Sequence, residues 1–129
     1  MNDQIKIVIS GGGTGGHLFP ALAIRDEINN RYPKSSIHYI GSKFGIEKDV
    51  LPIKNISHSL LPIRGFQRNM NLGSFGKNIL LPLRVFSSII KVKKLFDEIN
   101  PNLVIGTGGY AAAIPLSEGI SRGIPTLIQ

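Results

Sequence analysis

The stretch that decides the fold is residues 5–21, "IKIVISGGGTGGHLFPA", in which a run of β-branched residues leads into five glycines, a histidine and a proline. Ile5–Ser10 predicts a buried strand, because the run is short, apolar and rich in β-branched side chains. A helix is predicted from His17 to Arg31, where apolar residues recur at helical spacing and Pro20 is tolerated in the first turn. A strand, a glycine loop and a helix in this order begin an α/β unit.

The same alternation continues along the chain. Further strands are predicted at 36–41, 57–62, 102–106 and from 125 onward, and helices at 46–51, at 82–100 and within 108–123. This order predicts an α/β protein with a Rossmann-like, doubly wound parallel sheet covered by helices on both faces. We expect one domain over residues 1–129. Because the last predicted strand coincides with the end of the sequence, we also expect the sheet to belong to a longer protein.

Composition excludes several classes of function. The sequence has no cysteine, which rules out disulfides, thiolate catalysis and cysteine-ligated metals. Its three histidines (17, 38 and 58) are scattered, so no metal site is expected. The polar start "MNDQ" followed by a short strand is unlike a signal peptide, and no apolar run reaches the roughly 18 residues of a membrane span. These features predict a cytosolic protein.

Positive charge is concentrated in one region. The formal net charge is +7, and no acid occurs between Asp49 and Asp97, whereas eight cations do: Lys54, Arg64, Arg68, Lys77, Arg84, Lys91, Lys93 and Lys94. A polar loop, residues 63–77, lies inside this region. A nucleic-acid partner is disfavoured, because aromatic residues are few and the cations accompany aliphatic side chains.

The first glycine loop predicts an anion site. Bare backbone lets phosphate or sugar oxygens approach N–H groups, and the helix that follows adds a positive dipole end. Gly11-x-Gly13-x-x-Gly16 satisfies the weak dinucleotide pattern, but no acid follows the second strand before Glu47. NAD is therefore disfavoured, while NADP stays open through Lys43. A P-loop is excluded, since His17 and Leu18 replace the required Lys and Ser/Thr.

A second glycine cluster, "GTGGY" from Gly106 to Tyr110, follows the fourth predicted strand. Topology places it at the same sheet edge as the first, so the two are expected to line one cleft for a pyrophosphate and sugar hydroxyls. His17, at the mouth of this cleft, is a candidate general base, a candidate hydrogen-bond donor or a simple helix-start residue. His38 and His58 are expected to be structural.

The helix predicted at 82–100 has apolar residues on more than one face, edged by lysines and an arginine. One interpretation is an ordinary core helix with solvated cations. The other is a patch that docks on anionic lipid. The residues expected to dock are Arg84, Phe86, Ile90, Lys91, Lys93 and Lys94.

Three segments together, "GGTGGHLFPALAI", "PLRVF" and "GTGGYAAAIPL…GIPTLIQ", closely resemble the N-terminal domain of the MurG family, the UDP-N-acetylglucosamine transferases of peptidoglycan synthesis. The resemblance covers essentially the whole chain. It implies the N-terminal half of a B-type glycosyltransferase fold, and transfer of N-acetylglucosamine to a lipid-linked muramyl-pentapeptide (lipid I) to give lipid II. It also implies a peripheral location at the cytoplasmic face of the bacterial plasma membrane.

The resemblance further implies a separate C-terminal domain that supplies most contacts to the nucleotide, so these 129 residues alone are expected to be inactive. The expected partners are UDP-N-acetylglucosamine, the lipid-linked acceptor and an anionic membrane surface, with no cofactor. His17 is the expected catalytic residue. The expected substrate-binding residues are Gly13, Thr14, Gly15, Gly16, Gly106, Gly108, Gly109 and Tyr110. The alternatives are an NADP-dependent oxidoreductase domain and a basic membrane-binding module without catalysis.

Overall fold

The computed structural model describes residues 4–64 and 79–129. Five parallel strands form one sheet in the order β3-β2-β1-β4-β5. The strands are β1 (Lys6–Ser10), β2 (Ser36–Ser42), β3 (His58–Leu61), β4 (Leu103–Gly106) and β5 (Thr126–Ile128). Most of the polar loop at 63–77, with Arg68 and Lys77, lies outside the described residues.

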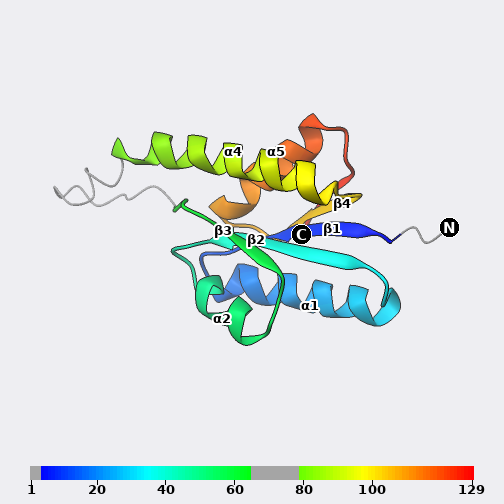
Figure 1. Cartoon of the computed structure of the whole chain (residues 1–129). Helices are drawn as coiled ribbons and strands as arrows, with labels where there is room; N and C mark the ends of the chain where they lie inside the picture. The colour runs from blue at the N-terminus through cyan, green and yellow to red at the C-terminus, as the bar shows by residue number, and fades with distance from the viewer. Residues whose placement is uncertain (1–3, 65–78) are drawn as a thin grey trace.

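Helices cover both faces of this sheet. Helices α1 (Gly15–Arg31) and α2 (Glu47–Ile53) lie on one face, and α4 (Leu81–Ile99) and α5 (Tyr110–Ser121) on the other (Figure 1). Successive β1 side chains alternate between the faces: Ile7 and Ile9 pack with Leu18 of α1, whereas Val8 packs with Phe96 of α4. The predicted Rossmann-like, doubly wound α/β architecture is confirmed.

Local chemistry explains where the helices begin and end. Helix α1 starts at Gly15, two residues before the predicted start, because Thr14 in an extended conformation already provides the N-cap. Proline in the first turn of α4 costs no hydrogen bond, because the first N–H groups of a helix have no partner within it. At its other end, Asn100 adopts a left-handed conformation with φ 51° and Pro101 follows, so the helix cannot continue.

The strand order reverses at the centre of the sheet, between β1 and β4. The chain moves outward from β1 through β2 to β3, then returns to the other side of β1 for β4. Ser10 is in register with both Ile40 of β2 and Gly106 of β4. The loops after these three strands therefore leave from one edge, at the point where doubly wound sheets bind ligands.

His38 connects the two outermost strands on the β3 side. Its Nδ1 lies 2.8 Å from Ser57 Oγ and its Nε2 lies 2.9 Å from Ser59 Oγ. Burial lowers the pKa of His38, and the nearby His58 lowers it further. A neutral imidazole has one donor and one acceptor nitrogen, which two serine hydroxyls can match. The structure thus gives His38 the structural role expected from its place in a strand.

This arrangement predicts a pH-dependent stability. A lowered pKa means that the folded state binds fewer protons than the unfolded state, so the free energy of unfolding should fall as pH drops below about 6.5. Urea denaturation of the chain between about pH 7.5 and about pH 5.5 should show this fall. His38→Gln keeps a donor and an acceptor without a titrating ring, and should flatten the dependence. An unchanged slope in the variant would contradict this role.

Candidate functional site

The site is built where the loops after β1 and β4 meet. The Gly12 N–H donates to Gly108 O at 3.4 Å, and the Thr107 N–H donates to Ser10 O at 2.9 Å. The Thr107 hydroxyl donates to His17 O at 2.6 Å, which ties the second loop to the first turn of α1. The two glycine clusters are therefore joined by backbone contacts into one unit, as their topology predicts.

This junction requires a glycine at position 109. Its φ is 82°, in a region that L-residues rarely adopt, and a Cβ there would collide with the carbonyl oxygen of Gly12. A Cβ on Gly108 would lie only 2.6 Å from His17 Nδ1. The second loop can therefore approach the first loop and the histidine ring this closely only because it has no side chains there.

His17 lies half-buried between the two loops, in the first turn of α1. Its Nδ1 is 3.1 Å from the carbonyl oxygen of Thr107. A carbonyl oxygen can only accept, so Nδ1 must carry the proton and donate. In the neutral ring this leaves Nε2 without a proton, as an acceptor. The geometry thus sets the tautomer that a general base needs.

Two glycines at the start of α1 leave backbone donors open. A helix cannot satisfy its first N–H groups internally, and within the described residues no acceptor is recorded for the N–H of Gly15 or Gly16. A Cβ on Gly16 would meet nothing closer than Thr14 Oγ1 at 3.7 Å, so packing does not require a glycine there. N–H groups without side chains around them at a helix N-terminus can bind the oxygen atoms of an anionic ligand.

The other predicted binding residues divide into two groups. Tyr110 reaches the first loop, since a Cβ on Gly13 would lie 3.3 Å from its hydroxyl oxygen, and Thr14 is exposed with no side-chain cap bond. Gly106 instead makes room for Leu116 of α5, whose Cδ1 would be 2.5 Å from an added Cβ. The predicted contact of Gly106 with substrate stays untested, and the structure gives this residue a packing role.

Glu47, at the start of α2, is the residue of this site that sequence reasoning missed. It is 0% exposed, and its Oε1 accepts from the Ser42 N–H at 2.7 Å. Both carboxylate oxygens lie near the Gly13 N–H, at 3.2 and 3.1 Å. Because its carboxylate is enclosed, Glu47 cannot hold a ribose as the acid of a dinucleotide site would. The only signal in the sequence is an acid that follows "GSKFGI" and precedes "KDVLP", and this pattern predicts no more than a helix start.

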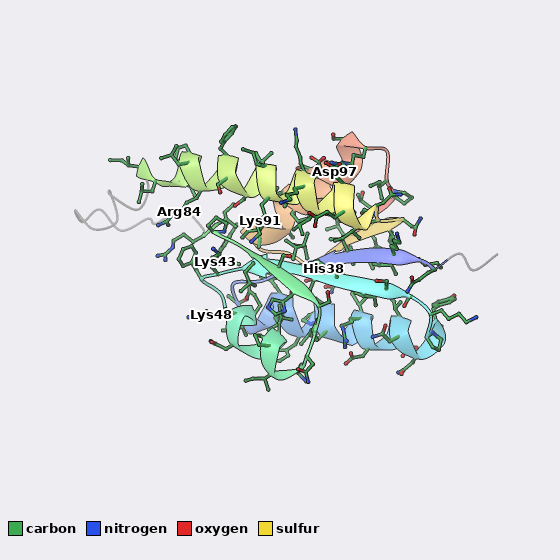
Figure 2. The ribbon with its side chains drawn as sticks, viewed as in Figure 1. His38, Lys43, Lys48, Arg84, Lys91 and Asp97 are labelled. Atoms are coloured by element: carbon green, nitrogen blue, oxygen red, sulfur yellow. The ribbon has the colours of Figure 1, made fainter. Side chains whose placement is uncertain are left out.

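The predicted docking residues of α4 point in two directions. Phe86 and Ile90 are exposed, as are Lys93 and Lys94. Arg84 and Lys91 instead face the ends of β2 and β3 (Figure 2): Arg84 Cζ lies 5.2 Å from the Phe44 ring centroid, and Lys91 Nζ donates to Leu60 O at 2.7 Å. Burial, and then the charge of Lys43, lower the pKa of Lys91. The ammonium of Lys91 is therefore used inside the domain, and its expected part in membrane docking stays untested.

The exposed face of α4 is an apolar stripe at helical spacing, which we call the α4 stripe. Its members are Ile79, just before the helix, and Leu83, Phe86 and Ile90, with exposed fractions of 59%, 67%, 64% and 53%. Lys93 and Lys94 flank its far end. No helix in residues 4–64 and 79–129 is both long and apolar enough to cross a membrane.

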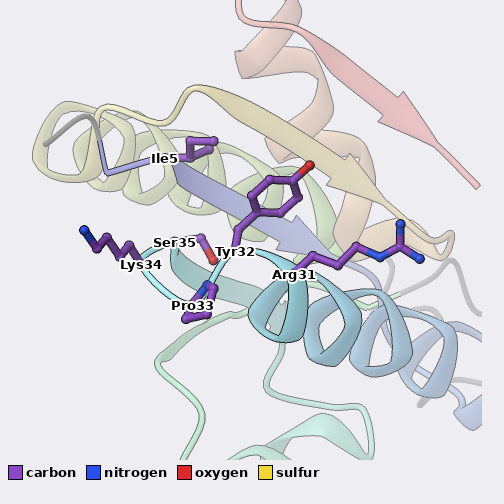
Figure 3. A pocket seen from close by; sticks show the side chains of 6 residues that line it. All are labelled: Ile5, Arg31, Tyr32, Pro33, Lys34 and Ser35. Carbon is purple, nitrogen blue, oxygen red and sulfur yellow. The ribbon is translucent and has the colours of Figure 1, made fainter. Parts of the chain in front are cut away.

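Two other observations bear on possible ligands. Within the described ranges, no three His, Asp or Glu side chains are grouped so that they could hold a metal ion. A cavity of about 350 Å³, lined by residues such as Ile5, Tyr32 and Ser35, lies at the opposite, amino-terminal edge of the sheet (Figure 3). Ligands of doubly wound sheets bind at the carboxyl edge, so this cavity is not part of the glycine-loop site.

The two kinds of glycine predict opposite effects on stability. Gly109→Ala should lower the free energy of unfolding by about 1–3 kcal/mol, through the left-handed φ and the collision with the Gly12 carbonyl. Gly16→Ala, the matched control in open space, should be neutral or slightly stabilising, because alanine is the better helix former. Urea denaturation of both variants measures the difference. Equal stability of the two would contradict the close approach of the loops.

Comparison with known proteins identifies the family of this chain. The glycosyltransferase family 28 N-terminal domain matches residues 7–129. The UDP-N-acetylglucosamine--N-acetylmuramyl-(pentapeptide) pyrophosphoryl-undecaprenol N-acetylglucosamine transferase of Christiangramia forsetii is 40% identical over 129 residues, covering 100% of this chain and 34% of the relative. The transferase of the same name from Bacillus subtilis is 37% identical over 125 residues, covering 97% and 33%. The chain thus spans about a third of the length of these curated relatives.

Solved structures show the same fold. The structure of Acinetobacter baumannii MurG superposes with a TM-score of 0.75 at 23% identity, covering 96% of this chain and 34% of that one. A UDP-N-acetylglucosamine 2-epimerase superposes with a TM-score of 0.55 at 14% identity, covering 99% and 32%. Because the family match covers residues 7–129, this chain belongs to the glycosyltransferase family 28 N-terminal domain family.

Proposed function

We propose that this chain is the acceptor-binding, membrane-side domain of an N-acetylglucosaminyltransferase. The reaction is transfer of N-acetylglucosamine from UDP-N-acetylglucosamine to undecaprenyl-pyrophosphoryl-muramyl-pentapeptide, which turns lipid I into lipid II. The names of relatives that are about 40% identical along the whole chain support this substrate pair. The observation that carries it is His17 at the meeting point of two glycine loops: its Nδ1 donates to the Thr107 carbonyl, which leaves Nε2 as an acceptor.

The acceptor's pyrophosphate is assigned to the start of α1. The open N–H groups of Gly15 and Gly16 and the positive end of the helix dipole can bind phosphate oxygens without a metal or a cationic side chain. Tyr110, whose hydroxyl reaches Gly13 from α5, is proposed to contact the same ligand. A bound pyrophosphate would hold the acceptor sugar near the His17 ring.

His17 acts as the general base of the transfer. Its Nε2 takes the proton from the acceptor hydroxyl as that oxygen forms a bond to the anomeric carbon of N-acetylglucosamine. The bond from that carbon to the UDP oxygen breaks, and UDP leaves with the electron pair. The Thr107 carbonyl, which accepts from Nδ1–H, stabilises the imidazolium formed in this step. The donor nucleotide is assigned to the part of the protein outside this chain.

The base role predicts a large loss of turnover. His17→Gln in the complete protein that carries this domain should reduce kcat by about 10²–10⁴-fold. His38→Gln is the matched control, because His38 contacts serines of the β3 edge and nothing in the glycine loops. Both variants should be checked for folding by circular dichroism and assayed with a lipid-linked acceptor. A kcat for His17→Gln within about threefold of the wild-type value would show that His17 is not the general base.

The α4 stripe is proposed to dock on the cytoplasmic face of the plasma membrane. Three exposed apolar side chains on one face of α4, with Ile79 just before the helix, are more apolar surface than α4 needs for packing against the sheet. Lys93 and Lys94 beside them can each contribute about 1 kcal/mol on anionic lipid. A polyprenyl acceptor stays in the bilayer, so the enzyme must approach the lipid surface.

Two variants separate the apolar and electrostatic parts of this docking. The double substitution Leu83→Ser and Phe86→Ser should weaken binding to both anionic and neutral vesicles, because it removes apolar side-chain area that would be buried in either lipid surface. Lys93→Glu with Lys94→Glu should weaken binding to anionic vesicles alone. This effect should shrink as salt is raised, because exposed charges are screened within about 8 Å at physiological ionic strength. Vesicle co-sedimentation of the complete protein measures both. If both variants bind vesicles as well as the wild type does, α4 is an ordinary core helix and does not dock on lipid.

A further inference from the structure

Glu47 is a buried carboxylate with an unusual set of partners. Among residues 4–64 and 79–129, the recorded ion pairs involve Arg25, Arg31 and Arg122, and none includes Glu47. Removing a carboxylate from water costs several kcal/mol unless hydrogen bonds or charges compensate. Here two backbone N–H groups, of Gly13 and Ser42, are the partners. These two amides are therefore the recorded contacts that compensate for burying the carboxylate.

The chain makes room for this carboxylate with glycines. A Cβ on Gly12 would collide with Glu47 Oε1, and one on Gly45 would collide with Oε2. A Cβ on Gly41 would lie 2.6 Å from Glu47 Cγ. Three glycines, two in loops and Gly41 in β2, are thus explained by one side chain. The glycine loop after β1 and the loop after β2 close around Glu47.

Glu47 divides the first glycine loop into two halves. In the first half, the Gly11 carbonyl accepts from the Tyr39 hydroxyl, the Gly12 N–H donates to Gly108 O, and the Gly13 N–H donates to Glu47. Every one of these groups is already satisfied inside the protein. In the second half, the N–H groups of Gly15 and Gly16 have no recorded acceptor among the described residues. Of the N–H groups of Gly12, Gly13, Gly15 and Gly16, only those of Gly15 and Gly16 are therefore open to a ligand among the described residues.

We propose that Glu47 is a positioning residue for the acceptor's pyrophosphate, an inference that rests on the proposed function. By fixing Gly13, it sets the first turn of α1 and hence the direction of the Gly15 and Gly16 N–H groups and of the His17 ring. Its negative charge, 3.1 Å behind the Gly13 nitrogen, also repels oxyanions from the Gly11–Gly13 half. The pyrophosphate is thereby directed to the helix start, next to the base.

Glu47→Gln tests this role with a side chain of almost the same size. A glutamine in the same position keeps the oxygen that accepts from the Ser42 N–H, but it puts a donating NH₂ group where Oε2 now accepts from the Gly13 N–H, and it removes the charge. In the complete protein we expect the KM for the lipid-linked acceptor to rise about tenfold or more, and kcat to fall. The KM for UDP-N-acetylglucosamine should stay within about twofold of the wild type, because the donor is bound elsewhere.

Glu118→Gln is the matched control. Glu118 is the other buried glutamate, 9% exposed on α5, and its Oε1 accepts from Arg122 Nε at 2.6 Å. Glu118→Gln weakens this ion pair and should therefore lower Tm, while the KM values for the acceptor and for UDP-N-acetylglucosamine stay unchanged. Glu47→Asp is the second variant, in case Glu47→Gln does not fold: it keeps the charge but is one methylene too short for both contacts, and should raise the acceptor KM as well. The proposal would be overturned if the acceptor KM were unchanged in both Glu47 variants. It would also be overturned if Glu118→Gln raised the acceptor KM as much as Glu47→Gln does.

Hydrogen exchange gives a readout that needs no substrate. Glu47→Gln should speed exchange of the Gly13 amide, whereas Glu118→Gln should not. If the wild-type protein transfers no sugar to the lipid-linked acceptor, the proposed function fails. The exchange rates then still decide whether Glu47 fixes the loop, and unchanged exchange at Gly13 in Glu47→Gln would overturn that part directly.

Discussion

The close approach of the loops after β1 and β4 is the constraint on which the site depends. The Gly12 carbonyl lies where a side chain on residue 109 would be, and the Gly12 N–H bonds back to Gly108. This contact brings the Thr107 carbonyl to His17 Nδ1 and the Thr107 hydroxyl to the His17 carbonyl. Without this contact, no carbonyl would fix the tautomer of the histidine.

The site uses backbone dipoles where many anion sites use cations. Although the chain carries a net charge of +7, the glycine loops contain no lysine or arginine. Their open donors are N–H groups at the start of a helix, which need no desolvation of a charged side chain. Buried Glu47 is balanced in the same way, by amides instead of an ion pair. The excess cations lie elsewhere, at the ends of β2 and β3 and along α4.

Helix α4 separates two tasks by helical periodicity. Its buried side, with Val92 and Phe96, packs on the sheet, and one flank places Arg84 and Lys91 against Phe44 and β3. The opposite side is the α4 stripe. A helix with a single apolar face could only pack on the sheet, whereas α4 has apolar residues on two. This explains why its composition alone allows both a core and a surface interpretation.

Local patterns in the sequence determined the architecture. β-branched runs, the glycine–helix junction and the Asn100-Pro101 stop predicted nearly every element, because strand and helix periods, caps and prolines act over a few residues. Topology then placed both glycine clusters at one edge. The motif also identified His17 as a candidate, but its role stayed open, because a sequence cannot show which ring nitrogen has a partner.

Only the tertiary structure decided the contacts between residues far apart in the chain. Glu47 meets Gly13 across 34 positions, and His17 meets Thr107 across 90, through the packing of separate loops at one sheet edge. Lys91 was expected among the membrane-facing cations, yet its ammonium bonds to Leu60, since its flank of α4 faces β3. Sequence spacing gives the angle of a side chain around its own helix, and only the docked helix shows which neighbour that angle meets.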